Sequence, residues 1–157
     1  MNEAYVLLGS NIEPEKNILL ALSYLEQNFL VYDVSHTWQT KPVGSDAADF
    51  LNTAVMIETE LDAYTLKERC LCHIEEQLGR VRQKDKNAPR TIDLDIIVFN
   101  GEVLDYNLYR YAHLILPFAE LLPEYVDPET EKTLLELAEE HIKLNTAKQL
   151  KHLAPPV

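Results

Sequence analysis

Two aspartates separated by a single residue stand near the start of the apolar segment TIDLDIIVF, which covers residues 91–99. In an extended strand, Asp93 and Asp95 would share one face, because successive side chains point to opposite faces. Neighbouring carboxylates on a half-buried face repel each other and need a partner. This pattern favours a divalent cation as the partner of the two carboxylates. Hard oxygen ligands suit Mg²⁺, which commonly binds one or two carboxylates together with substrate phosphates.

A run of basic residues directly precedes this segment. The stretch RVRQKDKNAPR, residues 80–90, holds five of the fourteen Lys and Arg residues and one acid. On a chain with a formal charge of -12, such an island fits a small, multiply charged anion better than a long nucleic acid, which the distant acids would repel. Arginines beside an Asp-x-Asp pair suit phosphoryl or pyrophosphoryl transfer. A solvated basic loop is the alternative interpretation of the island taken alone.

The strand that must carry the two acids is the clearest in the sequence, over residues 90–99. Its alternation predicts one face formed by Ile92, Leu94, Ile96 and Val98, and a second formed by Asp93, Asp95, Ile97 and Phe99. Both faces are largely apolar, which predicts a central strand.

The elements around this strand follow from hydrophobic period and from turn and cap residues. Further strands are predicted over residues 4–8, 30–39 and 50–60, and helices over residues 14–28, 63–78, 116–122 and 133–141. Asp62 and Gly79 are expected to cap the second helix, and residues 40–49 to form a loop. The order β-α-β-β-α-β predicts an α+β fold, the ferredoxin-like split βαβ arrangement, with helices covering one antiparallel-containing sheet.

Composition bounds the class of protein. With 157 residues, 46% hydrophobic and 25% charged, the chain is expected to form a single domain over residues 1–157, with a loose tail from about residue 148. No apolar run approaches the roughly 18 residues that cross a bilayer, and no basic leader is apparent, so we expect a cytoplasmic protein without membrane or nucleic-acid partners. Cys70 and Cys72 have neither zinc-ligand nor thioredoxin spacing and are interpreted as packing residues.

Several common catalytic motifs are missing from the sequence. It contains no Walker loop, no GxGxxG, no HExxH and no GxSxG. Dinucleotide binding, zinc chemistry and serine hydrolysis are therefore not supported, and the Asp-x-Asp pair with its basic island stays the main candidate site.

Four motifs together resemble the hydroxymethyl-dihydropterin pyrophosphokinases of folate biosynthesis. They are LLGSN at residues 7–11, T-x-P-x-G at 40–44 followed by FLN at 50–52, IE with GRVR at 74–82, and PRTIDLDI at 89–96. The resemblance spans most of residues 4–128, and the last two motifs are the most specific. It implies a ferredoxin-like fold and an ATP-dependent transferase that moves the two terminal phosphates of ATP to 6-hydroxymethyl-7,8-dihydropterin and releases AMP.

The resemblance also implies roles on the ATP side of the site. Asp93 and Asp95 would bind two Mg²⁺ ions, with Asp95 counted among the catalytic residues. Arg80 and Arg90 would be catalytic arginines that steady charge during attack on the β-phosphorus. The positions that would contact ATP are Glu75, Arg82, Lys86 and Ile96.

For the pterin, the resemblance implies backbone contacts in a loop, an amide and two aromatic rings. Asn52 presents a donor and an acceptor, as a pterin edge requires, and Phe50 supplies one flat ring. The loop positions are Thr40, Lys41 and Val43. Without the resemblance, Phe50 and Asn52 could equally be a core ring and a turn amide.

The segment GEVLDYNLYRYAHLI, residues 101–115, departs from the family pattern. It is shorter than usual and lacks a Pro-His-Pro element. His113 stands where the second pterin ring is expected, and Tyr111 stands where an arginine is expected, with Arg110 one residue away. Two alternatives to an active enzyme therefore stay open: a non-catalytic pterin-binding or regulatory module, and an acidic interaction domain whose basic island meets a protein partner.

Overall fold

The computed structural model describes residues 1–41, 48–80 and 91–150. Its strands are β1 (Asn2–Ser10), β2 (Leu30–Val34), β3 (Thr37–Thr40), β4 (Phe50–Thr59), β5 (Asp93–Phe99), β6 (Glu102–Val103) and β7 (Lys148–Leu150). Its helices are α1 (Pro14–Asn28), α2 (Ala63–Thr65), the π-helix η1 (Leu66–Leu71), α3 (Cys72–Gln77), the 3₁₀ helix η2 (Tyr106–Tyr109), α4 (Ala112–Leu121) and α5 (Leu134–Leu144). None of the helices in these ranges is both long enough and apolar enough to cross a membrane.

All strand pairs are antiparallel and form one sheet in the order β6-β5-β1-β4-β3-β7, with β2 also paired to β4. The third strand of the chain's β-α-β-β-α-β order is thus inserted between the first and the second, which is the split βαβ topology that the sequence predicts. The α+β class is confirmed.

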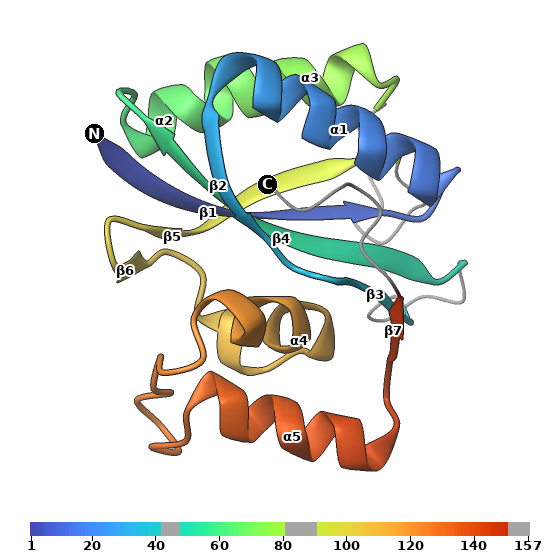
Figure 1. Ribbon diagram of the computed structural model, residues 1–157, viewed down its shortest axis with the longest axis vertical. Helices are drawn as coiled ribbons and strands as arrows, with labels where there is room; N and C mark the ends of the chain where they lie inside the picture. Colours follow the sequence, from blue (N-terminus) through green and yellow to red (C-terminus); the bar gives the residue numbers. More distant parts are fainter. Residues whose placement is uncertain (42–47, 81–90, 151–157) are drawn as a thin grey trace.

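Helices cover both faces of this sheet (Figure 1). On one face, α1 and the run α2-η1-α3 bury an apolar cluster that includes Ile18, Leu25 and Leu71. On the other face, α4 packs on β3 and β4, and α5 packs on α4, around Phe118 and Leu134. The sheet therefore separates two apolar cores.

The second predicted helix is one helical run with a wider turn in its middle. Asp62 caps it as expected, because its Oδ1 accepts the Thr65 N–H at 2.7 Å. Gly79 closes it at a positive φ of 84°, a conformation that glycine adopts without strain. The π-helical turn of η1 makes Leu66 and Leu71, five residues apart, fully buried, whereas Cys70 is only partly buried.

A β-bulge in β5 corrects the predicted faces of this strand. Tyr5 pairs with Val98 and Val6 with Ile96, so Ile97 is an extra residue on β5. As a result Ile97 and Val98 both enter the core beneath α4, and Phe99 packs in the core beneath α1. The prediction of faces holds through Ile97 and is wrong for Val98 and Phe99.

Other expectations need smaller corrections. The strand predicted over residues 30–39 is divided at Ser35 and His36 into β2 and β3. The helix predicted from residue 116 begins at Ala112, and the start of the tail expected to be loose forms β7, paired with β3. The strand carrying the acids is not central where they stand, because its pairing with β6 covers only Val98 and Phe99.

Glu120 joins helix α4 to the break between β2 and β3. Its carboxylate accepts hydrogen bonds from the Trp38 indole N–H at 2.7 Å and from the His36 backbone N–H at 3.0 Å, and it pairs with His36 Nδ1 at 2.7 Å. We expect Glu120→Ala to lower the free energy of unfolding by about 1–3 kcal/mol, because it leaves the indole donor without its partner. Urea denaturation measures this loss. The exposed Glu124→Ala is the control, and equal losses in the two variants would contradict this role of Glu120.

Candidate active site

Three strands bring the candidate residues of both halves of the site onto one face of the sheet. Gly9 of β1 pairs with Asn52 of β4 on one side and with Asp93 of β5 on the other. Directly paired residues of antiparallel strands project to the same face. Asn52 and Asp93 therefore flank Gly9 on one face, two strand spacings or about 10 Å apart.

The next row of the sheet confirms which face this is. Leu7 pairs with Ala54 and with Asp95, and both Leu7 and Ala54 belong to the core beneath α4. Asp95 thus shares the face of α4 with Asp93. Thr40, which pairs with Phe50, also lies on this face, two residues from Trp38 in the same core.

Gly9 is the residue that keeps the middle of this face open. A Cβ atom there would lie 3.4 Å from Oδ1 of Asn52 and 3.9 Å from Cδ1 of Phe50. A larger side chain would fill the space between the amide and ring on one side and the carboxylates on the other. The sequence motif that contains Gly9 therefore has a structural reason in the site.

The amide of Asn52 is held in place from β3. It is 2% exposed, and its Nδ2 donates to Thr40 Oγ1 at 2.7 Å and to the Trp38 carbonyl at 3.4 Å. Thr40 and Asn52, both predicted to contact the pterin, are thus in direct contact with each other. Phe50 is half-buried, whereas Lys41 is exposed.

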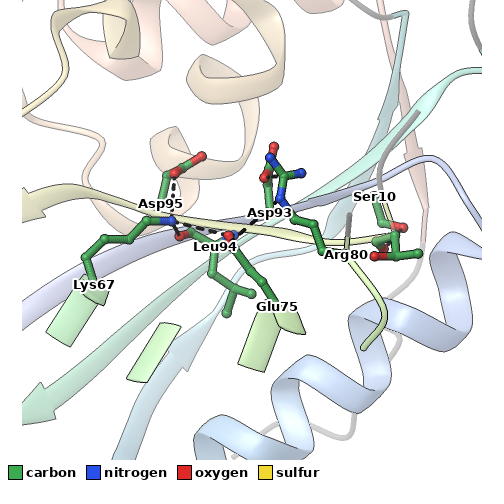
Figure 2. Close-up of polar contacts among 8 residues, drawn as sticks. Ser10, Lys67, Glu75, Arg80, Asp93, Leu94 and Asp95 are labelled. Atoms are coloured by element: carbon green, nitrogen blue, oxygen red, sulfur yellow. Dashed lines mark hydrogen bonds and ion pairs between the residues drawn. The ribbon is translucent and has the colours of Figure 1, made fainter. Parts of the chain in front are cut away.

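The two aspartates lie on the same side of β5, and each contacts a cation (Figure 2). Arg80, which follows α3, places its Nη1 2.9 Å from Oδ1 of Asp93. Lys67 of η1 places its Nζ 3.3 Å from Oδ1 of Asp95. The side chain of Asp93 is 19% exposed and that of Asp95 is 52% exposed, so the second carboxylate is the more open to solvent.

The backbone of β5 between these acids is bonded by side chains. Leu94 donates its N–H to Oε2 of Glu75 at 2.8 Å, and its carbonyl accepts from Nζ of Lys67 at 2.6 Å. Glu75 and Lys67 also pair with each other at 3.2 Å. These two side chains take the place of a neighbouring strand at the edge that carries the acids.

Glu75 is a buried anion and holds this edge together. Its side chain is 3% exposed, and its Oε1 lies 3.9 Å from Nε of Arg80 in addition to the bonds with Lys67 and Leu94. Burying a carboxylate is tolerated when cations and N–H donors surround it. The residue expected to contact ATP therefore also fixes the strand from which the aspartates project.

Electrostatics keep Lys67 charged. Its burial lowers the pKa of the ammonium, but the nearby carboxylates of Asp95 and Glu75 outweigh this effect and raise the pKa above its ordinary value. The site therefore contains a fixed positive charge next to Asp95 at neutral pH.

Some expected residues lie elsewhere or outside the described ranges. Ile96 is half-buried and packs toward the core beneath α1, on the opposite face from the aspartates. His113 lies in the first turn of α4 and stacks on Tyr111 at 5.7 Å between ring centroids. Arg110 is exposed and lies 3.9 Å from Glu129. The predictions for Val43, Arg82, Lys86 and Arg90 fall outside the described residues.

Lys67 is the site residue that sequence reasoning missed. The eight-residue separation between Lys67 and Glu75 gives no signal of contact in an ordinary α-helix of 3.6 residues per turn. The π-helical turn of η1 shifts the helical phase and brings the two side chains to the same edge.

The donor set of the site suits a hard cation. Within the ranges that the structure describes, no group of three or more His, Cys, Asp or Glu residues could hold a metal on its own. Two carboxylates with oxygen donors alone fit Mg²⁺, which completes its coordination with water and phosphate oxygens. A structural zinc site would need more protein ligands.

The split βαβ topology and the cation-paired aspartates define a ferredoxin-like α+β protein with a polar site at one edge of its sheet. The family model described as 7,8-dihydro-6-hydroxymethylpterin-pyrophosphokinase (HPPK) matches residues 5–123. The chain belongs to this family.

Curated relatives agree over most of their length. A protein of Bacillus subtilis named 2-amino-4-hydroxy-6-hydroxymethyldihydropteridine pyrophosphokinase is 36% identical over 155 residues, covering 91% of this chain and 90% of the relative. A protein of the same name from Methylorubrum extorquens is 38% identical over 138 residues, covering 80% and 86% of the two chains. The resemblance inferred from the four motifs is confirmed.

A solved structure supports the fold. The crystal structure of wild-type Plasmodium falciparum HPPK-DHPS with SDX-DHP superposes with a TM-score of 0.72 at 13% identity and covers 95% of this chain. This chain spans about half, 47%, of that longer chain. The likeness confirms the predicted ferredoxin-like arrangement.

The buried position of Glu75 yields a stability prediction. We expect Glu75→Ala to lower the free energy of unfolding by about 3–5 kcal/mol, because it leaves Lys67 and Arg80 half-buried without their shared anion. Urea denaturation followed by circular dichroism measures this effect. The adjacent, exposed Glu76→Ala is the matched control and should change stability by less than about 0.5 kcal/mol. Similar losses in both variants would show that Glu75 does not hold the edge.

Proposed function

We propose that this chain is an ATP-dependent pyrophosphokinase that transfers pyrophosphate from ATP to 6-hydroxymethyl-7,8-dihydropterin in folate biosynthesis and releases AMP. Membership of the HPPK family and the names of its relatives support this activity. The observation in the structure that carries the proposal is the shared face around Gly9, with an amide and a ring on one side and two carboxylates on the other.

The pterin would occupy the side of this face formed by β3 and β4. Asn52 is fixed by Thr40 and keeps Oδ1 directed toward Gly9, so its amide can serve a heterocycle edge without reorganising. Phe50 would stack on the ring, and His113 is proposed as the second ring. Thr40, Lys41 and Val43 would provide the loop contacts that the family resemblance implies.

The nucleotide would bind at the edge formed by β5. Asp93 and Asp95 would hold Mg²⁺, two ions by the family resemblance, with phosphate and water oxygens as the remaining ligands. When bound, the metal would neutralise phosphate charge and orient the triphosphate. Glu75, Arg82, Lys86 and Ile96 are the positions proposed to contact ATP. For Glu75 and Ile96, which the structure places under the edge and on the opposite face, such contacts would be indirect or peripheral.

In the reaction, the hydroxymethyl oxygen of the pterin forms a bond to the β-phosphorus, and the bond from that phosphorus to the oxygen shared with the α-phosphate breaks. The hydroxyl proton passes to solvent, and AMP leaves with the bridging oxygen and the electron pair of the broken bond. Arg80 would stabilise the developing charge from its place beside Asp93, where its Nη1 lies 2.9 Å from Oδ1 of that residue. Arg90 is proposed for the same role, as the family resemblance implies.

The non-catalytic pterin-binding module is not favoured, because both aspartates and Arg80 stand together at one edge. Cytoplasmic location and a single-domain organisation over residues 1–157 stay proposals from the sequence. Calorimetric titration separates the two functions: mutually enhanced binding of a non-hydrolysable ATP analogue and the pterin supports the enzyme, whereas pterin binding that ignores the nucleotide supports the module.

The activity is tested by AMP release from ATP and Mg²⁺, with and without the pterin alcohol. We expect pterin-dependent AMP release in the wild type and a loss of at least about a hundredfold in Asp95→Asn, since removal of a group that stabilises transition-state charge has this size of effect. The side chain of Asp95 is half exposed, so the variant should fold normally. The exposed Glu102→Gln on β6 makes the same change in charge and serves as the control. Undiminished AMP release in Asp95→Asn would remove the proposed mechanism.

Asn52 tests the pterin half of the site separately. We expect Asn52→Ala to weaken pterin binding by at least about tenfold, because the heterocycle then loses Oδ1 as a hydrogen-bond acceptor. Affinity for the ATP analogue should stay within twofold. Calorimetry with each ligand measures both values, and Asn28→Ala on α1 is the control. Equal weakening of both ligands would indicate a general loss of structure instead of a pterin contact.

A further inference from the structure

We infer that Lys67 is a positioning residue whose ammonium occupies Asp95 in the nucleotide-free protein, so that a divalent cation binds tightly only together with the triphosphate. The inference rests on the proposed function and adds a residue and a binding order to it. It follows from the contacts of Lys67, from the charges around it, and from the burial of the groups that hold its side chain.

The contacts of Lys67 use its full donor capacity. An ammonium has three N–H donors and no acceptor. Its Nζ lies 2.6 Å from the Leu94 carbonyl, 3.2 Å from Oε2 of Glu75 and 3.3 Å from Oδ1 of Asp95. Two of these partners belong to the buried edge, and the third is the most exposed acid of the site. The Leu94 carbonyl and Glu75 thus hold the ammonium in place, and its third contact is with Asp95.

The anchoring makes Lys67 different from a mobile surface lysine. Its side chain is 27% exposed, and Glu75, its other anionic partner, is 3% exposed. A lysine held by a buried carboxylate and a backbone carbonyl loses little further freedom when it pairs with Asp95. The ammonium of Lys67 therefore stays beside Asp95, whereas a mobile surface lysine would pair with it only transiently.

Each of the two metal-ligand candidates is paired with a cation. Arg80 lies 2.9 Å from Asp93, and Lys67 lies 3.3 Å from Asp95. A divalent ion that approaches the pair in the absence of nucleotide must bind carboxylates that are already paired with cations, and it is repelled by the fixed ammonium. The metal affinity of the empty site is therefore low.

A triphosphate changes this balance, because it brings several negative charges to the same edge. The negative charge of the phosphates offsets the positive charges of the metal, of Lys67 and of Arg80. Metal and nucleotide should therefore strengthen each other's binding. Such coupling is reciprocal by thermodynamic necessity. Lys67 increases this coupling by lowering the affinity of the metal more in the empty protein than in the nucleotide-bound protein.

The experiment measures Mn²⁺ binding by the electron paramagnetic resonance signal of the free ion. The dissociation constant is determined for the wild type, Lys67→Gln and Lys16→Gln, each with and without a non-hydrolysable ATP analogue. Lys67→Gln retains a donor for the Leu94 carbonyl and removes the charge. Lys16→Gln makes the same change in net charge at an exposed residue that pairs with Glu13 at 3.8 Å.

We expect Lys67→Gln to tighten Mn²⁺ binding by the nucleotide-free protein at least about fivefold, the effect of a unit charge near contact even at the dielectric constant of water. The mutual enhancement between Mn²⁺ and the analogue should fall by a similar factor. Lys16→Gln should leave both quantities within twofold of the wild type. A lysine that only packs at the edge would not change metal affinity in this direction.

Unchanged or weaker Mn²⁺ binding in folded Lys67→Gln would overturn the inference. Circular dichroism verifies folding, and Lys67→Met, which keeps the aliphatic stem, provides a second charge-free variant with the same expected result. Asp95→Asn separates the inference from the proposed function. If Asp95→Asn loses Mn²⁺ and AMP release while Lys67→Gln binds Mn²⁺ as the wild type does, only the role of Lys67 fails.

Discussion

The site depends on how the exposed edge of β5 satisfies its backbone hydrogen bonds. An edge strand presents N–H and carbonyl groups that need partners, and at Leu94 these partners are the side chains of Glu75 and Lys67. The same two side chains carry opposite charges and pair with each other. Their hydrogen bonds fix the strand, their charges organise Arg80 and Asp95, and the carboxylate pair projects from the segment that they hold. The same two side chains therefore fix the backbone of this edge and set the charges around the carboxylates.

The second constraint is the close packing of side chains across three strands. Gly9 separates the amide of Asn52 from the carboxylate of Asp93 without filling the face between them. Ser10, the next residue of β1, donates its hydroxyl hydrogen to the Thr91 carbonyl at 2.5 Å and ties the start of β5 to β1. Register and spacing in this part of the sheet thus set the distance between the two halves of the site.

The sequence contains enough information for the topology and for most of the candidate residues. Alternation and cap residues predict the strands β1, β4 and β5, the helix α1 and the caps at Asp62 and Gly79, because these depend on local patterns. Motifs locate Asp93, Asp95, Asn52 and Arg80. The bulge at Ile97 and the π-helical turn of η1 could not be predicted, because each adds one residue to a regular period and is selected by packing against other elements. Lys67 was missed for that reason.

The bulge at Ile97 has a consequence for the way β5 changes during evolution. It divides the strand into a segment in which Asp93 and Asp95 alternate with Leu94 and Ile96 of the core beneath α1, and a segment in which Ile97 and Val98 both enter the core beneath α4. An insertion or a deletion of one residue before Ile97 would turn the carboxylates to the other face and also expel the fully buried Leu94 from its core. The interior packing of Leu94 therefore constrains the length of the segment that carries the acids.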